Sequence, residues 1–181
     1  MWFSFKLTGI YYGNMEKFVP VLLKSVVPVL FSVFLIFSGH AQAAKAPGFS
    51  LAGDKAQISL KKYRGKVVYL DFWASWCIPC RKSFPWMNKM QEKYKSKGLV
   101  VIGINLDESK ADAKNFLKQV PGNFTMAYDP DGVTPGKYKV EVMPTSYLID
   151  RRGNLVHIHR GFKKSKADKM EAEIQSLLNK K

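Results

Sequence analysis

Residues 67–85 read VVYLDFWASWCIPCRKSFP, and no other stretch of the sequence says as much about the fold. Its first seven residues, 67–73, are apolar or aromatic except for Asp71. Such a run is typical of a strand that is buried on both faces of a parallel sheet. After the two cysteines, large apolar residues recur at near-helical spacing and predict a helix over residues 78–96, kinked at Pro85. The stretch therefore predicts a buried strand, a short turn carrying cysteine, and a helix.

The cysteine pair stands where this helix begins. At a helix N-terminus, free backbone N–H groups and the helix dipole stabilise a thiolate and lower the pKa of a thiol from about 8.5 to roughly 3.5–7.5. Pro79 fits the first turn, because its missing N–H would have no partner there. Cys80 lies one turn further on and is expected to point inward. We therefore expect Cys77 to attack a disulfide and Cys80 to resolve the mixed disulfide.

Two structural interpretations of the cysteines are weaker than a redox interpretation. A zinc site needs further ligands, but the chain has no second cysteine pair, and beyond the leader its only histidines are His157 and His159. These two share a predicted strand face with Leu155, where a partly exposed structural role is expected. A local staple is also a poor explanation, because so short a loop gains little from chain restriction. We expect no metal and no cofactor.

The remaining segments complete one α/β domain. Turn residues such as Asp129–Gly132 and Asp150–Asn154 separate periodic stretches. We predict a small hairpin over residues 49–60, strands over 99–106, 124–128, 145–149 and 155–160, a helix that opens at Ser109, and a last helix that opens at Ser165.

The N-terminus has the pattern of a targeting segment. Residues 25–37 carry no charge, follow two lysines, and lead to an A-x-A ending at Ala43. This pattern predicts a Sec-type signal peptide over residues 1–43, with Met15 as an alternative natural start. Cleavage after Ala43 would leave a periplasmic domain over residues 44–181. The alternative is a retained inner-membrane anchor that holds the domain on the periplasmic side.

The composition excludes several classes of protein. Two cysteines exclude a disulfide-dense scaffold, and the absence of a charge-free apolar run of 20 residues excludes a protein with several membrane spans. The net charge is +15, but the lysines are scattered with few aromatics between them, and an exported protein rarely meets nucleic acid. We expect no nucleic-acid partner, a solvated cationic surface that leaves association with an anionic membrane open, and a monomer.

Residues 67–85 resemble the active-site region of the thioredoxin superfamily, in its exported TlpA/ResA-like branch of thiol–disulfide oxidoreductases. Met143-Pro144-Thr145, just before a predicted strand, is similar to the cis-proline loop of that family. The resemblance covers residues 49 to about 178. It implies a thioredoxin-like α/β fold, in which helices flank a central mixed sheet, with an N-terminal β extension and an extra αβ insertion around residues 108–128.

The resemblance also implies site residues. Asp71 stands six residues before Cys77, where thioredoxin has a buried carboxylate; it would take the Cys80 proton as an acid/base with a raised pKa. A strand-end Asp hydrogen-bonded to backbone is the structural alternative. A cis Pro144 would let the Met143 backbone pair with an extended substrate segment.

Trp76 and Thr145 complete the expected substrate-binding set. Ser83 departs from the branch, because relatives that serve cytochrome c maturation often carry an acidic residue there. A thiol peroxidase relative is disfavoured, because its Thr three residues before the reactive cysteine is replaced by Ala74.

The predicted function is thus an exported thiol–disulfide oxidoreductase. We expect it to reduce protein disulfides through a mixed disulfide and to be reduced in turn by an upstream electron donor. The alternative is a non-catalytic thioredoxin-like copper carrier that binds the metal through Cys77, Cys80 and a histidine. Such carriers typically use a longer Cys-x-x-x-Cys loop. The tryptophan and proline beside the cysteines would have no function in a copper carrier.

Overall fold

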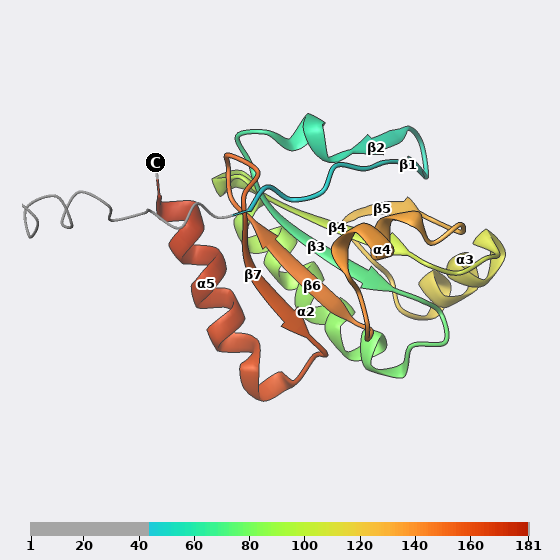
Figure 1. The fold of residues 1–181 in the computed structure, drawn as a ribbon. Coiled ribbons are helices and arrows are strands. Elements are labelled where there is room, and N and C mark those ends of the chain that lie inside the picture. Colours follow the sequence, from blue (N-terminus) through green and yellow to red (C-terminus); the bar gives the residue numbers. More distant parts are fainter. Residues whose placement is uncertain (1–43, 181) are drawn as a thin grey trace, which may run out of the picture. The chain divides into compact units, whose positions relative to one another are not determined.

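The computed structural model describes residues 44–180, so the predicted signal peptide lies outside the described residues. Seven strands form one mixed sheet in the order β2-β1-β5-β4-β3-β6-β7 (Figure 1). The strands are β1 (Ser50–Gly53), β2 (Gln57–Ser59), β3 (Val67–Trp73), β4 (Leu99–Asn105), β5 (Thr125–Tyr128), β6 (Thr145–Ile149) and β7 (Leu155–Arg160). The α-helices are α2 (Ile78–Tyr94), α3 (Lys110–Gln119), α4 (Val133–Tyr138) and α5 (Ala167–Asn179). Within residues 44–180, no helix is both long and apolar enough to cross a bilayer.

Strand β3 lies in the interior of the sheet, between β4 and β6, and all seven of its residues are buried. It pairs in parallel with β4 and antiparallel with β6, while β4 pairs in parallel with β5. The hairpin β1–β2 joins the sheet antiparallel to β5. The thioredoxin-like α/β fold is therefore confirmed, including the buried central strand, the mixed sheet and the small β entry.

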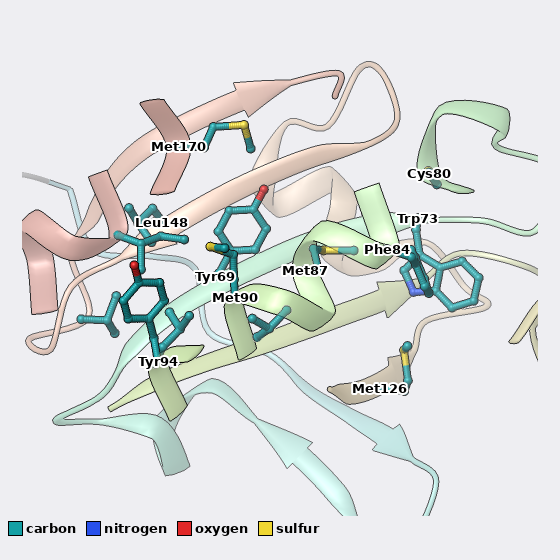
Figure 2. Close-up of a cluster of buried hydrophobic side chains, with 14 of the residues drawn as sticks. Tyr69, Trp73, Cys80, Phe84, Met87, Met90, Tyr94, Met126, Leu148 and Met170 are labelled. Atoms are coloured by element: carbon teal, nitrogen blue, oxygen red, sulfur yellow. The ribbon is translucent and has the colours of Figure 1, made fainter. Parts of the chain in front are cut away.

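The residues of β3 alternate between two apolar cores. Tyr69 and Trp73 point into the core under α2, α3 and α5. Leu70 and Phe72 point into the core under α4 and residues 46–49. Figure 2 shows the first of these cores, in which Cys80 lies at the same end as Trp73 and Phe84. Full burial of each large apolar side chain contributes about 1.5–3 kcal/mol, and the first core, which includes Ala74, Cys77 and Cys80, holds the cysteine-bearing turn in place.

Two details of the C-terminal segment differ from the predictions. The last helix begins at Ala167 rather than at Ser165, because the single 3-10 turn Lys164–Lys166 precedes it. Leu155 does not share a face with the histidines, because a register shift between Leu148 and Ile149 moves it to the other core.

Helix α4 has no counterpart in the sequence-based prediction. Its six residues read VTPGKY, and the proline and glycine in them are more typical of a loop. Gly132 precedes the helix with a φ of 65°, and the carboxylate of Asp129 accepts a 2.7 Å hydrogen bond from the Thr134 N–H. The helix is therefore stabilised by its preceding turn and by burial of Tyr138 rather than by its own propensity.

Candidate active site

Cys77 and Cys80 form a disulfide at the N-terminus of α2. Cys77 is the N-cap residue, Pro79 lies in the first turn, and the two Cα atoms are 5.3 Å apart. Cys77 is 4% exposed and Cys80 is 0% exposed. The structure therefore places the pair at the helix N-terminus, with Cys80 as the more deeply buried partner.

Asp107 anchors the turn that precedes the cysteines. Its carboxylate accepts hydrogen bonds from the Ser75 N–H at 3.0 and 3.1 Å and from the Ser75 hydroxyl at 2.9 Å. Asn105 supports the same carboxylate from the end of β4 with a 2.7 Å hydrogen bond from its Nδ2. Because β3 and β4 are parallel, their carboxyl ends meet at one edge of the sheet, and Asp107 reaches the turn from there.

A groove of about 690 Å³ opens beside the disulfide. One wall is the turn with α2, and the other is the segment that connects α4 to β6. Its lining residues are Trp76, Cys77, Ile78, Pro79, Leu106, Pro135, Val140, Glu141, Val142 and Met143. Three of the five large apolar side chains that are exposed within residues 44–180 belong to this lining: Trp76, Ile78 and Val142. The lining of the groove is thus mostly apolar.

The loop before β6 forms the other side of this groove. The Met143–Pro144 peptide bond is cis. Thr145 is buried and fastens the loop, since its hydroxyl donates a 2.7 Å hydrogen bond to the Val142 carbonyl. Among the backbone hydrogen bonds of residues 44–180 outside regular helices and strands, none involves Met143, whereas the Pro144 carbonyl accepts from Gly161 at 2.7 Å.

Asp71 is fully buried on β3. It lies between Tyr69 and Trp73 in the alternation of the strand, on the face that α2 covers. Its Oδ1 accepts a 2.7 Å hydrogen bond from the Ser146 hydroxyl, and its Oδ2 has no partner in the described part of the chain. Burial raises the pKa of Asp71 from 3.8 to about 7, although the hydrogen bond from Ser146 acts in the opposite direction.

The structure brings most of the predicted site residues together. Cys77, Trp76 and Met143 share the groove, and Pro144 and Thr145 shape its wall. Asp71 lies outside the groove lining, buried on the α2 face of the sheet, and its carboxylate is hydrogen-bonded to the Ser146 side chain rather than to backbone. Away from the groove, His159 Nε2 lies 2.6 Å from the carboxylate of Glu173, a contact that fits the structural role expected of the histidines.

Sequence reasoning missed three groups of the site: Asp107, Ser146 and the wall from residues 135–142. A usable signal existed only for Asp107, a carboxylate that directly follows a buried parallel strand beside β3. In the part of the chain that the structure describes, no three His, Cys, Asp or Glu side chains converge in a way that could hold a metal ion.

Comparison with known proteins gives three kinds of match. The family model described as Redoxin matches residues 41–177. A thiol-disulfide oxidoreductase ResA of Bacillus cereus is 40% identical over 140 residues, which cover 75% of this chain and 80% of that protein. ResA of Bacillus subtilis is 32% identical over 146 residues, covering 78% of this chain and 82% of that protein.

Among solved structures, a Chlorobium tepidum protein described as a candidate thiol:disulfide interchange protein DsbE is 52% identical to this chain. It superposes with a TM-score of 0.75 and covers 76% of this chain and 97% of that one.

Proposed function

The chain belongs to the Redoxin family and is a thiol–disulfide oxidoreductase, and on this premise we propose that it is an exported reductase of protein disulfides. One observation carries the proposal: the Cys77–Cys80 disulfide lies at a helix N-terminus, on the edge of an apolar groove. The structure holds the oxidised form, in which Cys77 and Cys80 are joined; a reductase would reach this form after it reduces one substrate disulfide.

In the first step, the Cys77 thiolate of the reduced enzyme attacks a substrate disulfide. A bond forms between the Cys77 sulfur and one substrate sulfur, and the other substrate sulfur leaves as a thiolate. The N-cap position supports this role for Cys77, because the free N–H groups of the first turn and the helix dipole favour negative charge there.

In the second step, Cys80 attacks the Cys77 sulfur. The Cys80 proton passes to the Asp71 carboxylate, the disulfide of the structure forms, and the second substrate sulfur leaves. Asp71 suits this task because its raised pKa of about 7 leaves both protonation states populated near neutral pH. Two electrons thus move from the dithiol to the substrate, and an upstream dithiol donor returns them.

Substrate contact is assigned to Trp76 and Met143, whereas the buried Pro144 and Thr145 hold the Met143 loop in position. The Met143 backbone, which enters no backbone hydrogen bond of the described loops, is placed to pair with an extended substrate segment. Trp76 is 67% exposed and offers an apolar surface beside Cys77. The partners are therefore protein disulfides whose neighbouring residues form an extended, partly apolar segment.

Export is proposed from the sequence alone. The uncharged residues 25–37 and the A-x-A ending at Ala43 support a periplasmic domain released by cleavage, with a retained inner-membrane anchor as the alternative. Mass spectrometry of the periplasmic fraction decides between them, because a mature chain that starts at residue 44 supports cleavage.

Trapping tests the mechanism. In Cys80→Ser the mixed disulfide cannot be resolved, so we expect partner proteins to stay bound through Cys77 and to be released by dithiothreitol. Cys77→Ser is the matched control and should trap none.

Equilibration with glutathione tests the direction of electron flow: a reductase should have a reduction potential nearer about −270 mV than about −120 mV. A value near the oxidising end would make the protein a disulfide donor instead.

A further inference from the structure

The carboxyl group of Asp71 ends a chain of two hydrogen bonds that crosses from β3 to β6 and back. Asp71 and Ser146 are direct partners in the antiparallel pairing of these strands. The Tyr69 hydroxyl lies 2.7 Å from the Ser146 hydroxyl, which lies 2.7 Å from Asp71 Oδ1. Tyr69 and Asp71 are two residues apart on β3, so both face the same core. All three side chains are buried.

The donor order in this chain follows from counting hydrogens. An ionised carboxylate can only accept, so Ser146 must give its single hydrogen to Asp71 Oδ1. Because the Ser146 hydrogen is already used, the Tyr69 hydroxyl must be the donor in the Tyr69–Ser146 hydrogen bond, and the Ser146 oxygen accepts. When Asp71 takes up a proton, Oδ1 is already engaged, and the proton belongs on Oδ2, which has no partner in residues 44–180.

The groups that face this chain come from three further elements. On α2, Cys80 lies in the same core and is held in the disulfide. On β7, His159 is the direct strand partner of Ser146. On α5, Glu173 contacts His159. Burial and the charge of Asp71 are the main causes that raise the pKa of Tyr69, and the charge of Glu173 adds a smaller rise. Because the Tyr69 pKa is raised, Tyr69 keeps its hydrogen and remains a donor across the working pH range.

We propose that Ser146, itself oriented by Tyr69, is a positioning residue that directs the exchangeable proton of Asp71 to Oδ2 and sets the pH range in which Asp71 accepts it. The inference rests on the proposed function, in which Asp71 is the base that accepts the Cys80 proton. It adds two residues outside the cysteine motif that tune this base. A hydrogen bond to the ionised carboxylate favours the charged form, so Ser146 offsets part of the effect of burial.

The test is a carboxyl carbon NMR titration of the oxidised, full-length protein, in which the Asp71 resonance is the one that Asp71→Asn removes. In Ser146→Ala we expect the Asp71 pKa to rise by about one unit or more, since the variant loses the hydrogen bond that favours the ionised carboxylate. Ser146→Thr keeps a hydroxyl and should restore most of the shift. Tyr69→Phe leaves the direct bond intact and should raise the pKa by a smaller amount.

Tyr147→Phe is the matched control for Tyr69→Phe. Its hydroxyl is also buried and donates to the Tyr138 carbonyl, but it lies on the opposite face of the sheet, so the Asp71 titration should not move. An Asp71 titration that is the same in Ser146→Ala as in the wild type overturns the inference, as does an equal shift in both Tyr→Phe variants.

The titration is independent of catalysis, so it separates this inference from the proposed function. If the Asp71 pKa rises in Ser146→Ala and the rate of Cys80 attack shows its pH dependence at a correspondingly higher pH, both the inference and the proposed function are supported. If the pKa rises and the rate profile stays in place, Ser146 still controls Asp71, and the assignment of Asp71 as the base falls.

Discussion

Ser75 and Asp107 are joined by hydrogen bonds from both the backbone N–H and the hydroxyl of Ser75 to one carboxylate. Ser75 lies two residues before Cys77, and Asp107 lies just beyond the neighbouring strand β4. The position of the cysteine-bearing turn therefore depends on a residue from a distant part of the chain. This contact ties the edge of the parallel sheet to the start of α2.

Replacing Asp107 should loosen this turn. In Asp107→Ala the Ser75 and Asn105 donors lose their acceptor inside the protein, and unsatisfied buried groups cost about 1–3 kcal/mol. We expect urea unfolding at a lower midpoint and slower reduction of insulin. Ser75→Ala is the control, because it removes only the hydroxyl bond and should have the smaller effect on both measurements. Equal stability of wild type and Asp107→Ala would show that the contact does not hold the turn.

The buried carboxyl of Asp71 should make stability depend on pH. Between pH 3.8 and about 7 the folded protein holds a proton that the unfolded chain has lost. The free energy of unfolding therefore falls as pH rises across this window, by about 1.4 kcal/mol per pH unit from this group, and levels off above it. Asp71→Asn should remove this contribution, so the free energy of unfolding of the variant, relative to that of the oxidised wild type, should increase as the pH rises to about 7. Urea unfolding at several pH values measures the difference, and a constant difference would contradict the raised pKa.

These features differ in how far the sequence predicts them. The run 67–73 and the cysteine pair after it are local patterns, and they predict the buried strand, the helix start and the thioredoxin-like fold. Asp71 stands out because a lone carboxylate in such a run needs a reason to be buried.

Other parts of the site depend on pairings that no local pattern carries. Ser146 reaches Asp71 only because β6 pairs with β3 in one particular register. Helix α4 forms from residues with low helix propensity, because the preceding turn and the core hold it. Its connection to β6 supplies one wall of the groove, so the shape of the groove could not be predicted from the sequence.

The apolar rim of the groove should contribute to substrate binding. Val142 is 50% exposed on this rim, so Val142→Ser should leave folding unchanged while removing apolar contact with the substrate. We expect the KM for insulin to rise by about tenfold or less, with little change in kcat, since burial of such a side chain contributes about 1.5 kcal/mol. Ile158→Ser changes a side chain that is 42% exposed on β7 outside the groove. It is the control and should leave KM unchanged; a rise in both variants would reject the groove as the docking surface.

The two cysteines should differ in reactivity once they are reduced. In Cys80→Ser the remaining thiol is Cys77 at the N-cap, beside the groove; in Cys77→Ser it is the fully buried Cys80. Iodoacetamide near neutral pH should therefore modify Cys80→Ser much faster than Cys77→Ser, because only Cys77 combines the helix N-cap position, which stabilises a thiolate, with a place in the groove lining. Mass spectrometry at timed intervals gives both rates. Equal, slow rates would remove Cys77 from the role of nucleophile.

The role of Asp71 as the base for Cys80 can be measured in a single turnover, as the rate at which the mixed disulfide is resolved. Reduced enzyme is mixed with insulin in a rapid-mixing instrument, and acid quenching followed by mass spectrometry separates formation of the Cys77 adduct from its decay across neutral pH. In Asp71→Asn, adduct formation should keep its wild-type rate, because the helix N-terminus activates Cys77 independently. Decay of the adduct should slow, by ~10²-fold or less as is usual for the loss of a general base, and its pH dependence near the Asp71 pKa of about 7 should disappear. Decay at the wild-type rate at every pH would contradict this mechanism and leave Asp71 with a structural role alone.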